Sequence, residues 1–155
     1  MNARTSSITD IPHYVGGTRF AGTSSRSQGD IIDFALKYDP QPFHLDDEAA
    51  KNTFFGRLSA SGWHTGAMAM RMMVDHYISP LASMGSPGID EVRWTMPVRP
   101  GDTLHSEVIV ESVTLSRSKP DRGVAKLKFQ VVNQRSEEVA SYYLNLMLKS
   151  RSVLA

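Results

Sequence analysis

The sequence predicts an α+β domain in which an antiparallel sheet of about five strands surrounds one long helix. Apolar and polar residues alternate strictly in several segments of the C-terminal half, and short polar turns separate these segments. Alternation with a period of two residues is typical of half-buried strands. A long helical segment precedes most of these strands, and its apolar residues lie on several sides.

Length and composition indicate one globular domain. A chain of 155 residues can bury one core but is short for two. We therefore expect residues 1–155 to form a single domain, with a loose arm over residues 1–12, which are rich in Asn, Ser and Thr. The formal net charge is +1 and the basic residues are scattered, so nucleic acid is not an expected partner.

The absence of cysteine excludes disulfides, thiolate nucleophiles and Cys-based metal sites. No stretch approaches the roughly 18 consecutive apolar residues of a membrane-spanning helix. Residues 1–17 lack the apolar run of a secretory signal. These observations predict a cytoplasmic protein with no membrane partner.

The N-terminal half begins with an expected strand around Thr18 to Ser25. Gly29 and Asp30 precede Ile31–Leu36, which reads as a short amphipathic helix. Residues 46–48 are acidic and are expected to open a second helix, because acids suit a helix N-terminus. The long helix is expected from Ser61 to Tyr77, with Ser59 or Ser61 as its N-cap. Since its apolar residues do not form one stripe, we expect it to be enclosed on several faces.

Four strands are expected after the long helix, over residues 92–96, 104–115, 126–131 and 142–148. Polar turns near residues 100–102, 120–123 and 135–138 join them, which predicts antiparallel pairing of consecutive strands. Trp94 is expected to be an interior strand residue. A sheet around one helix leaves an edge and an apolar flank uncovered, which predicts self-association.

The segment YDPQPFHLDD, residues 38–47, places Asp39 and His44 at the two ends of a proline-containing stretch. If that stretch were extended, the two Cα atoms would lie roughly 16 Å apart, at about 3.3 Å per residue. The two side chains can share one water only if the segment bends. Pro40 and Pro42 would hold such a bend at little entropic cost, as a positioned acid/base pair requires. A plain structural turn is the alternative interpretation, since Asp before Pro often initiates turns.

A resemblance adds to this interpretation. The following residues resemble the hydratase signature of the MaoC-like dehydratases, which include the (R)-specific enoyl-CoA hydratases: Phe34, Ala35, Tyr38, Asp39, Pro40, Pro42, Phe43, His44, Asp46, Ala49 and Ala50, followed by Ala60, Ser61 and Gly62. The segment PVRPGDTL, residues 97–104, is similar to a turn usual in that family. The resemblance extends from about Gly16 to Lys149. It implies the hotdog fold.

The resemblance implies roles for three residues. Asp39 and His44 match a catalytic pair that adds water across the double bond of a 2-enoyl thioester, giving a 3-hydroxyacyl thioester, or removes it. Gly62 matches the glycine whose N–H binds the thioester carbonyl. The first turn of a helix has unpaired N–H groups and a positive dipole end, which suits that role. The implied partner is an acyl-CoA or acyl carrier protein thioester, with no other cofactor. No metal is expected, because no two histidines lie at the i, i+4 spacing of a helical metal site, and the uncovered sheet edge leads us to expect a homodimer or a higher even oligomer.

The chain departs from the signature at several positions. Tyr38 and Gln41 stand where the family commonly has Gly and Asn, so substrate fit is expected to differ. Residues 67–70 of the long helix offer no small polar side chain of the kind that often helps to fix the pair. His64 lies two residues after Gly62 without an obvious partner, and we assign it no catalytic role.

Two alternative functions share the same fold: an acyl-CoA thioesterase and a non-catalytic acyl-thioester-binding subunit. The first acid of the long helix is Asp75, near its far end, which counts against hydrolysis. The Met-rich run from Met68 to Met73 is interpreted either as core or as the lining of an acyl channel. Six basic residues are candidates to contact the coenzyme A phosphates, and most are expected to be solvated surface charges: Arg57, Arg93, Arg99, Arg117, Lys119 and Arg122.

Overall fold

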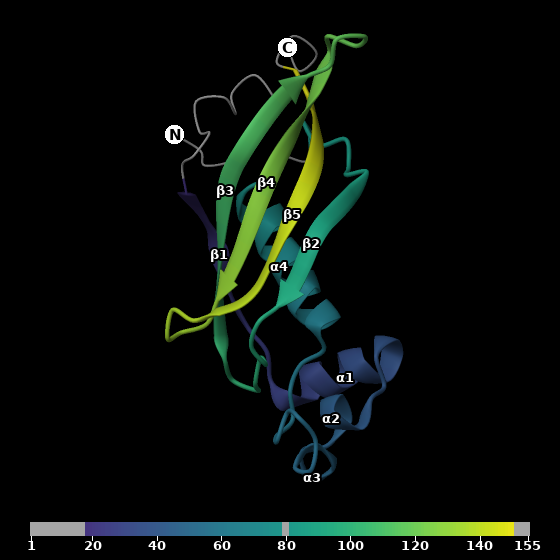
Figure 1. The fold of residues 1–155 in the computed structure, drawn as a ribbon, viewed down its shortest axis with the longest axis vertical. Helices are drawn as coiled ribbons and strands as arrows, with labels where there is room; N and C mark the ends of the chain where they lie inside the picture. Colours follow the sequence, from purple (N-terminus) through teal and green to yellow (C-terminus); the bar gives the residue numbers. More distant parts are fainter. Residues whose placement is uncertain (1–17, 79–80, 151–155) are drawn as a thin grey trace.

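A five-stranded antiparallel sheet lies across one long helix in the computed structural model, which describes residues 18–78 and 81–150 (Figure 1). The expected α+β arrangement is confirmed; the expected arm over residues 1–12 lies outside the described residues. The elements in chain order are β1 (Thr18–Ser25), α1 (Gln28–Tyr38), α2 (Pro42–Leu45), α3 (Asp47–Ala50), α4 (Gly62–His76), β2 (Gly88–Trp94), β3 (Thr103–Leu115), β4 (Arg122–Val132) and β5 (Glu138–Lys149).

The strand order in the sheet is β1-β3-β4-β5-β2. The pairing of β3 with β4 and of β4 with β5 through short turns is as expected. The expected pairing of β2 with β3 is wrong, because β2 pairs with β5 on the other side of the sheet. The segment between β2 and β3 forms no hairpin: Thr95 donates to the Val139 carbonyl, and the Val98 carbonyl accepts from Ala60. Alternation within a strand shows which face is buried but not which strand lies alongside.

The core lies between the inner face of the sheet and α4. Every second residue of β4, and of β5 from Ala140 on, is buried, as the alternating pattern predicted. Full burial of one such aliphatic or aromatic side chain contributes about 1.5–3 kcal/mol. The core side chains include Met68, Met72 and Met73 of α4 together with Leu104, Val108, Val110, Leu127, Phe129, Val131, Leu144, Leu146 and Leu148 of the strands.

The long helix runs within one residue of its expected ends, with the Ser61 hydroxyl as N-cap. The expectation that it is enclosed on several faces is wrong in part. Trp63 is 61% exposed and Val74 is 43% exposed, so one side of α4 faces away from the sheet. The methionines of the opposite side are buried core, which favours the first of their two interpretations. A sheet on one side of a helix covers only the stripe that faces it.

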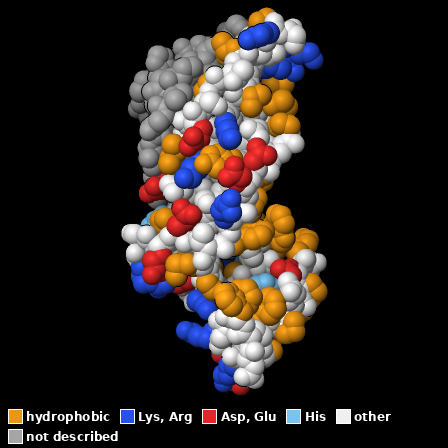
Figure 2. All heavy atoms as spheres, viewed as in Figure 1, with side chains coloured by type: hydrophobic (Ala, Val, Ile, Leu, Met, Phe, Trp, Pro, Cys, Tyr) orange, Lys and Arg blue, Asp and Glu red, His pale blue; other side chains and the backbone are white. Residues whose placement is uncertain are grey.

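The outer face of the sheet carries the polar members of the alternating strands. Figure 2 shows basic and acidic side chains intermingled over this face, while hydrophobic side chains gather between the end of β2 and the short helices. Trp94, the last residue of β2, is 46% exposed, so its expected interior position is wrong. No helix within residues 18–78 and 81–150 is long and apolar enough to span a bilayer.

Three short helical segments bring the proline-containing stretch to the start of α4. Helix α1 ends at Tyr38, and the Asp39 N–H, as C-cap, donates to the Ala35 carbonyl. Pro42 occupies the first turn of α2, where its missing N–H costs nothing. Helix α3 begins after Asp46, whose side chain accepts from Ala49, as the acidic run predicted. The single turn of α2 was not expected, because four residues carry no periodic signal.

Candidate active site

Asp39 and His44 face each other across a tight bend. The Asp39 carbonyl accepts from Gln41 at 2.8 Å, and the Gln41 carbonyl accepts from His44 at 2.9 Å, so two successive turns fold the segment back. Atom Nε2 of His44 lies 3.4 Å from Oδ2 of Asp39, and their side chains are 6% and 19% exposed. The bend that the two prolines suggested is present, and it brings the carboxylate and the imidazole within reach of one another.

Two side chains hold the Asp39 carboxylate from opposite ends. The Ser61 hydroxyl donates to Oδ2 at 2.6 Å, and the Gln41 amide donates to Oδ1 at 2.7 Å. Partial burial by itself raises the pKa of Asp39, but the hydrogen bonds from Ser61 and Gln41 and the nearby His44 imidazole lower it further than burial raises it. The carboxyl group is therefore ionised at neutral pH.

These contacts change two expectations from the sequence. Gln41 does not simply add bulk where the family commonly has Asn, because its amide binds the carboxylate. The small polar residue missing from the middle of the long helix is supplied by Ser61 at its N-cap. Sequence inspection considered Ser61 as a cap and as part of the family resemblance but not as a partner of Asp39, since nothing local indicates that a carboxylate 22 residues away lies beside it.

The imidazole of His44 is oriented by a main-chain carbonyl. Its Nδ1 lies 2.8 Å from the oxygen of Ser59. A carbonyl oxygen only accepts, so Nδ1 carries a proton and Nε2 is the ring nitrogen that faces Asp39. Phe43 meets the ring edge-on at a centroid distance of 4.6 Å. Nε2 thus lies toward Asp39 and the adjoining cavity.

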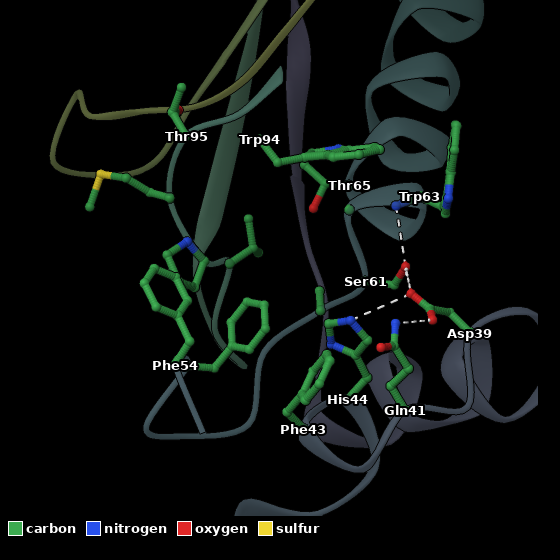
Figure 3. A pocket seen from close by; sticks show the side chains of 16 residues that line it. Asp39, Gln41, Phe43, His44, Phe54, Ser61, Trp63, Thr65, Trp94 and Thr95 are labelled. Atoms are coloured by element: carbon green, nitrogen blue, oxygen red, sulfur yellow. Dashed lines mark hydrogen bonds and ion pairs between the residues drawn. The ribbon is translucent and has the colours of Figure 1, made fainter. Parts of the chain in front are cut away.

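The cavity beside the pair has a volume of about 460 Å³. Figure 3 shows Asp39, Gln41, His44 and Ser61 grouped at one end of it, with Trp94 lying across the start of α4. Gly62 also lines it, so the cavity brings together all three site residues that the sequence singled out. The lining is completed by Phe43, Phe54, Phe55, Ala60, Trp63, Thr65, Thr95, Met96, Pro97 and Val98.

Gly62 is the first residue of α4, where an N–H has no acceptor within the helix. The indole of Trp94 packs directly on this glycine: a Cβ added at residue 62 would lie 2.5 Å from Cε2 of Trp94. Trp94 also meets Trp63 edge-on at a centroid distance of 5.2 Å. The absence of a side chain at residue 62 therefore lets Trp94 form a wall of the cavity, which strand alternation alone did not reveal.

His64 does not belong to this group. Its ring stacks on Phe34 of α1 at a centroid distance of 4.5 Å, and it does not line the cavity. Burial and the positive charge of Arg26 lower the pKa of His64, against an opposing effect of Asp30. This placement agrees with the interpretation of His64 as non-catalytic. No three His, Asp or Glu side chains cluster as metal ligands in the part of the chain that the structure describes.

The sequence model of the "MaoC like domain" family matches residues 15–133. The chain belongs to the MaoC-like domain family. A crystal structure of a MaoC-like dehydratase from Rhodospirillum rubrum is 39% identical and has a TM-score of 0.81, covering 88% of this chain and 93% of the other. The fold of this MaoC-like chain is accordingly the hotdog fold that the resemblance implied.

Two further structures are similar to this MaoC-like chain. The (R)-hydratase PhaJ1 from Pseudomonas aeruginosa is 25% identical, with a TM-score of 0.73, and the match covers 94% of this chain and 86% of that one. A structure described as a monoamine oxidase regulatory protein from Archaeoglobus is 27% identical, with a TM-score of 0.83 and coverage of 97% and 98%. The chain thus has the fold of a hydratase/dehydratase family, some of whose members carry other descriptions.

Proposed function

We propose that this MaoC-like protein adds water to the C2=C3 bond of a 2-enoyl-CoA, or removes it from a 3-hydroxyacyl-CoA. The observation that carries the proposal is the pairing of the Asp39 carboxylate with Nε2 of His44 at 3.4 Å, at the end of a cavity that Gly62 also lines. An acid/base pair of this kind must lie within about 3 Å of the proton it transfers.

In the hydration direction, Nε2 of His44 takes a proton from a water as the water oxygen bonds to C3. The electrons of the double bond move toward the thioester carbonyl, whose oxygen becomes enolate-like. The imidazolium then passes its proton to Asp39, and the carboxyl group delivers it to C2. The carbonyl re-forms, and both side chains return to their starting charges. Dehydration follows the same steps in reverse.

The developing oxyanion needs a donor, and Gly62 is proposed for that role. Its N–H lies at the positive end of the α4 dipole, where negative charge is favoured. Removing one such donor typically costs about 3 kcal/mol of transition-state stabilisation. Trp94 covers one side of Gly62, so the thioester would approach from the side of Asp39 and His44.

The substrate is proposed to be carried on coenzyme A or an acyl carrier protein, and the protein to act in the cytoplasm as a homodimer or higher even oligomer. Strand β2 is an edge of the sheet, and its Ile89 and Trp94 are each 46% exposed. Unpaired edges with exposed apolar residues favour association with another chain. Measuring the molar mass in solution by light scattering tests the assembly.

The catalytic assignment is tested with Asp39→Asn and His44→Gln, assayed against crotonyl-CoA and a series of longer enoyl-CoAs. Each variant is expected to lose at least about 100-fold in kcat, within the range for general acid–base groups. Asp33→Asn and His76→Gln are matched controls, because both residues are exposed and outside the cavity. The assignment is wrong if wild type turns over a substrate and the two site variants match it within a factor of about two.

The same assay separates the alternatives. A thioesterase releases free thiol from acyl-CoA, whereas a hydratase releases none. The position of Asp75 gives no support to hydrolysis, because it pairs with Arg71 at 2.7 Å and does not line the cavity. A non-catalytic subunit would bind the thioester without turnover in any variant.

A further inference from the structure

We propose that Arg99 is a positioning residue for His44, acting through the main chain of residues 55–59. This inference rests on the proposed role of His44 as base, and it concerns how that ring is kept in the required tautomer and orientation. Arg99 lies in the connection between β2 and β3, in sequence far from the residues that it would position.

The guanidinium of Arg99 binds three main-chain carbonyls of one loop. Nη1 donates to the carbonyls of Arg57 at 2.6 Å and Leu58 at 3.2 Å, and Nη2 donates to that of Phe55 at 2.7 Å. None of the ion pairs found within residues 18–78 and 81–150 includes Arg99. These contacts occupy donors that a surface arginine would offer to a phosphate, so the loop, and not coenzyme A, is the partner that the structure assigns to this side chain.

The base of Arg99 is itself anchored to the sheet. Its N–H donates to Oδ2 of Asp102 at 2.8 Å. The other oxygen of this buried carboxylate accepts from the Gln134 amide at 2.8 Å, and the Gln134 oxygen accepts from the Thr103 N–H at 3.0 Å. The loop is therefore connected through one guanidinium to a group of hydrogen-bonded residues where β3 begins and β4 has just ended.

Two consecutive carbonyls connect the Arg99 guanidinium and the three carbonyls it binds, here called the Arg99 clamp, to the site. The carbonyl of Leu58 accepts from Arg99, and the next one, of Ser59, accepts from Nδ1 of His44 at 2.8 Å. The Ser59 N–H returns to the Phe43 carbonyl at 3.2 Å. The peptide unit between Leu58 and Ser59 is planar, so Arg99 at its carbonyl and Phe43 at its N–H fix one plane, and only the φ and ψ of Ser59 separate this plane from the Ser59 carbonyl. Loss of the clamp would free the acceptor that selects the Nδ1–H tautomer.

The clamp also holds an aromatic wall. Phe55, whose carbonyl accepts from Nη2, stacks on Phe43 at a centroid distance of 4.7 Å and lies 5.6 Å from the ring of His44. A planar guanidinium can donate to several carbonyls at once from a fixed fork, whereas an ammonium group is a single point on a flexible stem. Lysine at residue 99 would keep the charge but only part of the geometry.

The test uses the full-length chain with Arg99→Gln and Arg99→Lys, and Arg71→Gln as a matched control on the exposed side of α4. The readout is the pair of ring ¹⁵N chemical shifts of His44, recorded at about pH 8, where an ordinary imidazole is neutral, and assigned with His44→Gln. Wild type and Arg71→Gln are expected to show one protonated nitrogen, Nδ1. In Arg99→Gln, the two ring ¹⁵N shifts are expected to move toward each other as the two tautomers exchange. The shifts of Arg99→Lys are expected to lie between those of wild type and Arg99→Gln.

With a substrate, Arg99→Gln is expected to lower kcat about 10- to 100-fold with little change in KM, since small displacements of a catalytic group cost such factors. Wild-type ring shifts in a folded Arg99→Gln variant, or loss of native circular dichroism in both Arg99 variants, overturn the inference. The ring shifts need no turnover. If the tautomer changes in Arg99→Gln but wild type turns over no substrate, the proposed function is rejected and the role of Arg99 in orienting His44 remains.

Discussion

The hydroxyl of Ser61 joins the start of α4 to the carboxylate of Asp39. It donates to Oδ2 of Asp39 at 2.6 Å and accepts from the Trp63 N–H at 3.3 Å. One side chain is thus both the helix cap and the support of the acid. The distance between the carboxylate and the N–H of Gly62 consequently depends on Ser61, which directly precedes that glycine.

Replacing Ser61 by alanine is expected to remove both functions. The loss of the cap should lower the free energy of unfolding by about 1 kcal/mol. The loss of the bond to Asp39 should lower kcat about 10-fold or more, because the carboxylate is no longer held in place. Urea unfolding and steady-state kinetics measure the two effects.

Ser27→Ala is the matched control for this change. Ser27 caps α1 in a capping box with Asp30, away from the cavity. It should lower the free energy of unfolding by a similar amount and leave kcat unchanged. Equal kcat losses in both variants would mean that activity follows stability and not the Ser61 contact.

Gln41→Ala is expected to move the acid limb of the pH–rate profile to higher pH. The amide of Gln41 lowers the pKa of Asp39, so without it the carboxyl group protonates at a higher pH as the pH falls. Activity that needs the carboxylate is present above this pKa and is lost below it. Gln41→Asn serves as the conservative variant; an acid limb that stays in place in Gln41→Ala contradicts the assignment.

His64 is expected to make the protein less stable in mild acid. Burial holds the pKa of the folded imidazole below its ordinary value of 6.5, so the unfolded chain binds the proton more readily. The contribution of His64 to the free energy of unfolding is therefore fully present above pH 6.5, and it declines as the pH falls toward the pKa of the folded state. Comparing urea midpoints at about pH 8 and about pH 5.5 measures the decline.

His64→Phe keeps a ring against Phe34 but removes the titrating group. The difference between its two midpoints should be smaller than in wild type. A decline of the same size in both proteins would assign the acid sensitivity to other residues.

Gly62→Ala is expected to reduce both stability and activity, although its N–H is retained. The added Cβ would lie 2.5 Å from the Trp94 indole, so the indole must move. If this contact is the cause, the double variant Gly62→Ala, Trp94→Leu should lose less stability and activity than the sum of the losses in the two single variants. Residues in contact commonly show a coupling of about 0.5–3 kcal/mol in such a cycle. Additive losses would place the requirement for glycine elsewhere.

Much of the fold follows from local patterns in the chain. Helix α4 occupies residues 62–76, against an expected 61–77, because a capping serine and a long apolar segment mark it. Strands β3, β4 and β5 alternate with a period of two and are joined by short turns, so their pairing needed no further information. The stretch around Asp39 and His44 was found because two prolines and a family-like spacing mark it.

Long-range contacts decided the rest. Strand β2 lies beside β5, Trp94 covers Gly62, Ser61 reaches Asp39, and Arg99 holds a loop of another segment. Each of these contacts joins residues far apart in the chain, and a periodic pattern reports only whether a side chain faces the core, not what it meets there. The sequence alone thus determined the strands, the long helix and the chemical groups, whereas packing of the sheet on α4 decided which groups lie within hydrogen-bonding distance.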